Sequence, residues 1–203
     1  MYKKCNTEES AHRQQQLEEC LLENMLVRPY CEISVSDLCQ QAGISRKSFY
    51  RYFGNKDGCL NALLDRVLIE MSKPPTSDMP SSSEYPLDLF HALSYWKQHK
   101  TLLDTLAENN LTDKLLERVM LHTVKEEKNL LHCMGIDDNL QDCDALLFSV
   151  SGYVSLIMHW NATGFQKSPQ ELVATLIRLT TKPLLCLPGH EENTHVSISE
   201  RTL

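Results

Sequence analysis

One short stretch of the chain concentrates side chains that bind anions. Residues 43–56 contain no Asp or Glu, although the chain as a whole is acidic. Their four cationic residues are Arg46, Lys47, Arg51 and Lys56. Guanidinium and ammonium groups bind phosphates, and the same groups hydrogen-bond to base edges in the major groove of DNA. We therefore predict a polyanion-binding patch here, because such binding depends on the local potential rather than on the net charge.

The charge of the whole chain is spread unevenly around this patch. The 203 residues carry 20 Lys or Arg and 27 Asp or Glu, a formal net charge of −7. Residues 1–70 have a net charge of −1, and residues 71–203 have one of −6. The apolar share of 42% and the charged share of 23% are typical of a globular protein. With only 7 Gly and 8 Pro, the composition favours long helices over a sandwich or a barrel.

Four helices are predicted for the first 72 residues from capping residues and from apolar residues at helical spacing. They begin after Thr7, Ser34, Ser45 and Asn55, and they end before Pro29, at Ala42, at Phe53 and near Met71. Gly43 follows the second helix at the position where a left-handed residue is favoured. The second and third helices, joined by residues 42–45, predict a helix-turn-helix.

The third of these helices has two different faces. Phe49 and Phe53 are four residues apart, so they share one side of the helix and form its predicted buried stripe. The outward face is then basic and rich in hydroxyl groups, and it is formed by Arg46, Lys47, Ser48, Tyr50 and Arg51. Such a face is typical of a helix that lies in the major groove of DNA.

A second, larger helical domain is predicted beyond residue 72. Residues 73–86 are rich in Pro and Ser and form the predicted linker. Helical apolar spacing recurs over 87–98, 100–108, 112–133, 139–164 and 168–185. Residues 188–203 are polar and are predicted to be disordered. The predicted fold class is all-α with about nine helices, with a three-helix helix-turn-helix domain in residues 1–72 and a larger helical domain in residues 87–187.

The first third of the chain resembles the DNA-binding domain of TetR/AcrR-type transcriptional regulators. The resemblance covers about residues 10–70 and is carried by VSDLCQQAGISRKSFYRYFGNKDGCL, residues 35–60. Its most specific part is Tyr50-Arg51-Tyr52-Phe53 with Lys56 three residues later. The chain departs from the family pattern in three places. Arg28-Pro29-Tyr30 replaces a glycine–aromatic pair, Cys39 replaces the usual alanine, and Lys47 replaces a small residue or proline.

The resemblance implies a role in DNA binding for each matching residue. Arg46, Lys47 and Ser48 are the expected base-reading residues. Tyr50, Tyr52 and Lys56 are the expected phosphate contacts, and Ser36 is a further candidate for a phosphate or a base. Ser45 and Arg51 complete the predicted DNA-binding set. The expected partner is double-stranded DNA with a palindromic operator, and repression is the family's usual mode.

The last two long helices are predicted to form a homodimer. Small residues recur along one ridge of the segment 139–164, namely Ala145, Ser149, Gly152 and Ser155. The segment 168–185 is apolar over more than one narrow stripe, so it must be covered on more than one side. Two copies from each subunit predict a four-helix bundle whose twofold axis matches a palindromic operator.

The family resemblance also implies that the second domain binds an effector, so residues 87–187 are the expected effector-binding and dimerisation domain. Aromatic residues there suggest a largely apolar small molecule, contacted by Trp96, Phe148, Tyr153 and Trp160, with His122 or His159 as a polar anchor. Control by a protein partner, or by metal or thiol chemistry, stays open as an alternative. A helical adaptor without specific DNA binding is the rival class, but it would not need the basic face.

Other functions find little support in the sequence. The chain contains no nucleophile motif, phosphate loop, zinc-protease motif or pair of carboxylates in an apolar setting, so we expect no enzyme and no cofactor. His122, His132, Cys133 and Cys143 lack the spacing of a metal site. Residues 145–166 are uncharged but too polar for a membrane span. The first residues lack a secretory apolar segment, so a cytoplasmic protein with reduced thiols is expected.

Overall fold

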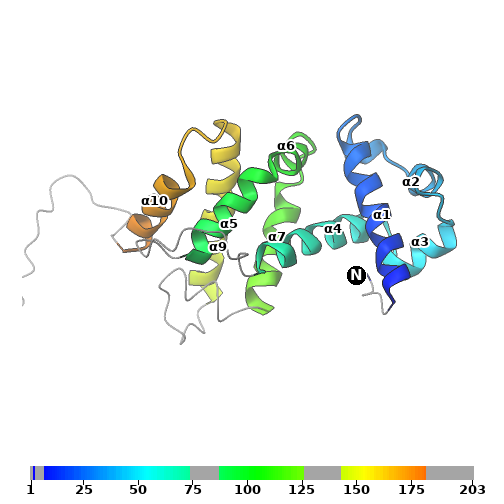
Figure 1. Ribbon diagram of the computed structural model, residues 1–203, viewed down its shortest axis with the longest axis horizontal. Coiled ribbons are helices and arrows are strands. Elements are labelled where there is room, and N and C mark those ends of the chain that lie inside the picture. Colours follow the sequence, from blue (N-terminus) through cyan, green and yellow to red (C-terminus); the bar gives the residue numbers. More distant parts are fainter. Residues whose placement is uncertain (1, 3–6, 74–86, 126–142, 182–203) are drawn as a thin grey trace, which may run out of the picture.

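Nine α-helices and one 3-10 helix make up the regular structure that the computed structural model describes. The described residues are 2, 7–73, 87–125 and 143–181, and these contain no strand. The helices are α1 (Glu8–Met25), η1 (Tyr30–Glu32), α2 (Val35–Ala42), α3 (Arg46–Phe53), α4 (Lys56–Met71), α5 (Leu87–Gln98), α6 (Lys100–Glu108), α7 (Thr112–Lys125), α9 (Cys143–Ala162) and α10 (Pro169–Thr181). The all-α prediction is confirmed. In Figure 1 the helices form an elongated molecule, with α1–α3 at one end and α10 at the other.

The helix boundaries in the N-terminal part follow the predicted caps. The side chains of Thr7, Ser34 and Ser45 each accept a hydrogen bond from a backbone N–H three residues later. Ser34 forms a complete capping box, in which Asp37 accepts a hydrogen bond from the Ser34 backbone. Gly43 has a φ of 64°, the left-handed conformation expected after α2. These local contacts place α2 and α3 as a helix-turn-helix.

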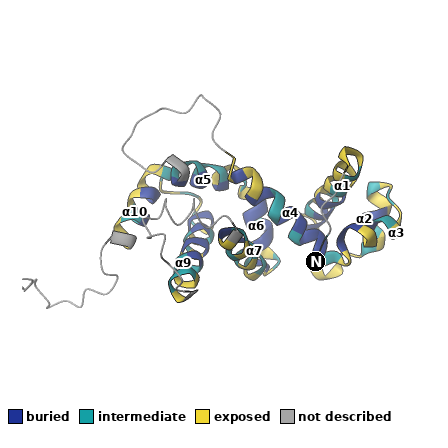
Figure 2. Ribbon diagram, turned by 90° about the horizontal axis from the view of Figure 1, so that it is seen from below, coloured by how far each residue is buried: buried dark blue, intermediate teal, exposed yellow. Residues whose placement is uncertain are grey.

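Helix α4 lies at the centre of the molecule and is buried along most of its length (Figure 2). It packs against α1 and α3 on one side and against α5 and α7 on the other. The apolar core is therefore continuous from Phe49 in the helix-turn-helix, through Leu64 in α4, to Leu103 in α6. This continuity gives the second domain a direct mechanical connection to the helix-turn-helix.

The second domain has a core of large side chains on α5, α6, α9 and α10. Trp96, Leu103, Tyr153, Trp160 and Val173 are all buried there. The predicted segments 87–98 and 100–108 match α5 and α6. Several predicted segments lie partly or wholly outside the described residues. These are residues 74–86 of the linker, residues 126–133, 139–142 and 182–185 of the last three predicted helices, and the tail 188–203.

One predicted boundary in the last helices needs correction. Helix α9 ends at Ala162 rather than at residue 164, because Gly164 and Phe165 adopt positive φ angles of 69° and 55°. Helix α10 packs against α5 within the chain, and its predicted contact with a second subunit stays a prediction. Leu172 and Val173 are buried within the single chain.

None of the described helices is both long enough and apolar enough to cross a membrane.

Candidate nucleic-acid interface

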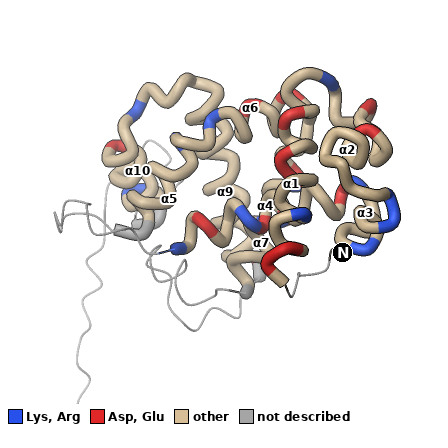
Figure 3. The backbone as a smooth tube through the Cα atoms, turned by 45° about the vertical axis from the view of Figure 1, so that its right-hand side comes forward, with Lys and Arg blue, Asp and Glu red and all other residues tan. Residues whose placement is uncertain are grey.

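In α3 the basic residues lie on the exposed face and the two phenylalanines on the buried face, as the sequence predicted. Phe49 and Phe53 are fully buried and hold the helix against the domain, with ring centroids 5.1 Å apart. Arg46, Lys47 and Arg51 are exposed. Figure 3 shows that the basic positions of α3 lie at the outer end of the molecule. A long polyanion can therefore approach the helix-turn-helix from outside without meeting the second domain.

The cations of α3 are not neutralised by any acidic residue in the described part of the chain. Among the ion pairs of the described residues, none includes Arg46, Lys47 or Arg51. An acid on the same surface would compete with phosphate for these groups, and burial would fix their conformations. Since neither applies to Arg46 and Lys47, both side chains are free to adapt to a DNA groove.

The hydroxyl residues of the predicted set have different environments. Ser45 caps α3, since its hydroxyl oxygen accepts from the backbone N–H of Ser48 at 3.2 Å. Ser36, in the first turn of α2, and Tyr50, on α3, are exposed. Tyr52 is only 5% exposed, and its hydroxyl accepts a hydrogen bond of 3.2 Å from Arg51. Tyr52 therefore supports Arg51 through its hydroxyl and its ring more than it presents a surface of its own.

Lys56 is held at the start of α4 by two backbone carbonyl groups. Its ammonium nitrogen donates to the carbonyl oxygens of Tyr30, at 2.5 Å, and Ile33, at 2.8 Å. The ammonium also lies 4.2 Å from the centroid of the Tyr30 ring. Partial burial lowers the pKa of Lys56 from its ordinary value. An ammonium group has three donors, so one remains for a phosphate, next to the amide groups at the N-terminus of α4.

Two features of this surface were missed in the sequence. Tyr30 provides both the carbonyl and the ring that position Lys56, and its own hydroxyl donates to Asp57 at 2.5 Å. A bidentate ion pair between Arg118 and Asp65 joins α7 to the middle of α4. Arg118 Nε donates to Asp65 Oδ1 at 2.7 Å, and Arg118 Nη2 donates to Asp65 Oδ2 at 2.5 Å. The aromatic residue after Pro29 was a signal for the first feature. Nothing in the local sequence pairs residue 65 with residue 118.

The predicted effector residues are not brought together around one described cavity. Trp96, Tyr153 and Trp160 are buried in the core, whereas Phe148 is 65% exposed. The Trp160 indole N–H donates to the carbonyl oxygen of Lys167 at 2.9 Å, which gives that residue a structural role. His122 lies outside this core, where its ring nitrogen is 2.8 Å from the Ser72 hydroxyl.

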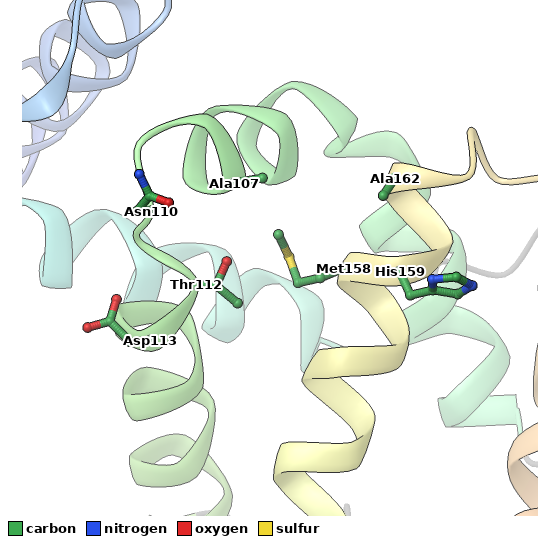
Figure 4. Close-up of a pocket in the computed structure, with 7 residues that line it drawn as sticks. All are labelled: Ala107, Asn110, Thr112, Asp113, Met158, His159 and Ala162. Carbon is green, nitrogen blue, oxygen red and sulfur yellow. The ribbon is translucent and has the colours of Figure 1, made fainter.

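An open groove of about 510 Å³ lies between the α6–α7 turn and the end of α9. The residues that line it are Ala107, Asn110, Thr112, Asp113, Met158, His159 and Ala162 (Figure 4). Figure 4 shows Met158 pointing toward the α6–α7 turn, while His159 points away along the other side of α9. His159 is the member of the predicted effector set among these lining residues, although its ring points away from the α6–α7 turn.

No group of three or more His, Cys, Asp or Glu side chains within the described ranges is arranged to hold a metal ion. His132 and Cys133 lie outside those ranges.

Comparisons with known proteins agree with the geometry of the N-terminal domain. Residues 25–63 match the family described as bacterial regulatory proteins, tetR family. The HTH-type transcriptional regulators EthR of Mycobacterium tuberculosis and Mycobacterium bovis are 43% identical to this chain over 65 residues, which is 30% of each protein. The chain thus matches less than a third of the length of these curated relatives.

The likeness to solved structures extends over most of the chain. A TetR transcriptional regulator from Streptococcus agalactiae superposes with a TM-score of 0.62 over 85% of this chain and 95% of its own, at 15% identity. The dihydroxyacetone kinase operon activator DhaS gives a TM-score of 0.50 over 83% and 93%, at 17% identity. At these identities the likeness establishes the fold of the second domain and nothing about its ligand.

Proposed function

We propose that this chain, whose N-terminal domain is a TetR-family helix-turn-helix, is a homodimeric transcriptional repressor that binds a palindromic operator in double-stranded DNA. The observation that carries the proposal is the outer face of α3, where Arg46 and Lys47 are exposed and form no ion pair with the residues that the structure describes. An adaptor protein would have no need of such a face at the outer end of the molecule.

The proposed roles divide the surface into base-reading and phosphate-binding residues. Arg46, Lys47 and Ser48 lie in the first turn of α3, the part of a recognition helix that reaches base edges. Tyr50 and Lys56 bind phosphates on either side of the groove and fix the register of the helix. Ser36 adds a contact from α2.

The homodimer is supported by the exposed face of α9. Leu147 and Phe148 are 53% and 65% exposed, which is unusual for large apolar side chains next to each other. Further along α9, Gly152 and Ser155 are exposed, and a Cβ atom added at Gly152 would meet nothing within 4 Å. Large apolar residues beside small ones allow another helix to approach closely. A second copy of α9 is the proposed occupant.

Control by a small molecule is supported by two buried polar groups in the second domain. The indole N–H of Trp96 and the hydroxyl of Tyr153 are at least 96% buried and face each other, and neither has a well-formed hydrogen bond to another described residue. Leaving such groups without partners is costly, so each calls for an explanation. An apolar effector with a hydrogen-bond acceptor would give the Tyr153 hydroxyl a partner.

Selection of duplexes from random DNA tests the central proposal. Arg46→Ala is expected to cost about 1–3 kcal/mol of binding free energy and to relax the preference at one base pair. Lys56→Ala is expected to weaken binding to all sequences and to lower the slope of log K against log salt by about 0.9. Lys97→Ala, which removes an exposed lysine of α5, is the matched control and should change neither quantity. Selection that yields no preferred sequence contradicts the proposal.

Tryptophan fluorescence tests the effector, because both tryptophans lie in the second domain. Compounds that release the selected duplex should change the emission, and Trp96→Phe should weaken their binding. If Trp96→Phe and Trp160→Ala leave binding and release unchanged, the proposed effector site is wrong. Release by a partner protein, with no effect of any compound, would replace the small molecule by that mode of control.

A further inference from the structure

One side chain of the second domain reaches the start of the helix-turn-helix. Asn109 is the C-cap residue of α6, and its Oδ1 accepts a hydrogen bond of 2.5 Å from the backbone N–H of Tyr30. Its Nδ2 donates to the carbonyl oxygen of Thr105 at 2.9 Å and reaches that of Met25 at 3.5 Å. The amide of Asn109 is therefore fixed by its own helix and oriented toward η1.

Tyr30 connects Asn109 to the start of α4 through hydrogen bonds. Its N–H is bonded to Asn109, its carbonyl oxygen accepts from Lys56, and its hydroxyl donates to Asp57. Pro29 precedes it with a φ of −56°, which restricts the backbone on that side. A displacement of the Tyr30 peptide therefore moves the carbonyl oxygen that holds the Lys56 ammonium.

An ion pair between the two domains lies further from Lys56. The Arg118–Asp65 ion pair joins α7 to α4 nine residues after Lys56, which corresponds to about 14 Å along the helix. That pair sets the direction of α4, whereas the Asn109 contact acts on the neighbours of Lys56 directly. The two contacts thus have separable effects.

We propose that Asn109 is a positioning residue for DNA binding, through which the second domain holds Lys56 in its phosphate-binding position by way of Tyr30. This inference rests on the proposed function, because it requires Lys56 to contact a phosphate. Asn110, the next residue, lines the groove between the α6–α7 turn and α9. Anything that shifts this turn withdraws the acceptor from Tyr30 and releases Lys56.

The test measures DNA binding and amide exchange in the full-length protein. Asn109→Ala removes the acceptor, whereas Asn109→Asp keeps an acceptor oxygen but loses the N–H that donates to Thr105, so the second variant should rescue the first in part. Asn110→Gly is the matched control, since it alters the same turn and tolerates the φ of 55°. The probe is the duplex that the unmodified protein selects from random DNA, titrated over a range of salt concentrations.

Asn109→Ala is expected to lower the salt slope by about 0.9, as Lys56→Ala does, and the double variant should lower it no further. The Tyr30 amide should exchange about fivefold faster with solvent, as expected for the loss of one neutral hydrogen bond. Asn110→Gly should keep the slope of the unmodified protein, and Asn109→Asp should have a slope between those of Asn109→Ala and the unmodified protein. A purely structural role of Asn109 would lower the melting temperature without changing the slope.

The inference is overturned if Asn109→Ala speeds exchange of the Tyr30 amide and leaves the salt slope unchanged, or if its effect adds fully to that of Lys56→Ala. Should Asn109→Ala fail to fold, Asn109→Ser replaces it, since a serine hydroxyl is too short to reach Tyr30. If the unmodified protein selects no duplex, the proposed function has failed, and the inference, which depends on it, fails with it. Amide exchange at Tyr30 then still reports whether the contact forms in solution.

Discussion

Replacing Gly58 by alanine is expected to destabilise the protein, although alanine is the better helix former. Gly58 lies in the first turn of α4, where its backbone N–H donates to the side chain of Asn55 at 2.7 Å. A Cβ atom at this position would lie 2.0 Å from the carbonyl oxygen of Phe53 and 3.0 Å from its carbonyl carbon. Both atoms belong to the backbone at the end of α3, so no side-chain rotation can relieve the overlap.

The magnitude follows from two opposing effects. Helix propensity favours alanine over glycine by about 1 kcal/mol. Relief of the overlap requires the start of α4 to move about 1 Å away from the end of α3, and such overpacking costs about 1–3 kcal/mol, occasionally more. Because the overlap is with backbone, we take the upper part of that range and expect a net loss of about 2 kcal/mol in the free energy of unfolding. DNA binding should weaken as well, since the same shift displaces Lys56.

Urea unfolding followed by circular dichroism measures the effect. Gly152→Ala is the matched control, because Gly152 is also helical and a Cβ atom there meets nothing within 4 Å. It is best made in a Phe148→Glu background, where a dimer contact cannot contribute, and there it should gain about 1 kcal/mol. If Gly58→Ala is as stable as the unmodified protein or more stable, the close approach of α3 and α4 is wrong.

Three further substitutions probe the dimer, a buried carboxyl group and the contact between the domains. Phe148→Glu should convert the dimer to a monomer in sedimentation analysis without unfolding it, whereas Val27→Glu, at an 81% exposed site in the N-terminal domain, should not; a dimer that survives Phe148→Glu excludes this face. Burial raises the pKa of the Glu18 carboxyl from its ordinary value of 4.5, so the native state binds more protons than the unfolded state between 4.5 and the raised value. The free energy of unfolding should therefore fall as pH rises through that window, and Glu18→Gln should remove this slope; an unchanged slope would show that another group titrates. Arg118→Met should cost about 3 kcal/mol because it leaves Asp65 largely buried without its cation, and the double variant with Asp65→Leu should recover most of that stability in the same urea experiment.

The N-terminal domain was predictable because its determinants are local. The caps Thr7, Ser34 and Ser45 act on N–H groups three residues away, and Gly43 ends α2 through its own φ angle. The division of α3 into a buried face with Phe49 and an exposed basic face follows from the helical period alone. Interactions between residues three or four positions apart can be predicted directly from the sequence.

The contacts of the proposed DNA-binding residues were only partly predictable. The positions of Arg46 and Lys47 on the surface followed from the pattern, but the environment of Lys56 did not. Its two carbonyl partners, Tyr30 and Ile33, lie 26 and 23 residues earlier in the chain. Every residue has a backbone carbonyl group, so the sequence does not indicate which of them will accept a hydrogen bond from a distant lysine.

The second domain shows most clearly what the tertiary structure alone decided. The sequence marked Trp96, Tyr153 and Trp160 as aromatic residues on helices, and that pattern is the same for a core as for a ligand pocket. Packing of α5 against α9 and α10 buried all three, while Phe148, on the same helix as Tyr153, was left 65% exposed. The link from Asn109 to Tyr30 spans 79 residues of sequence. Burial and long-range hydrogen bonds depend on which helix faces meet, and that is fixed only when the whole chain has folded.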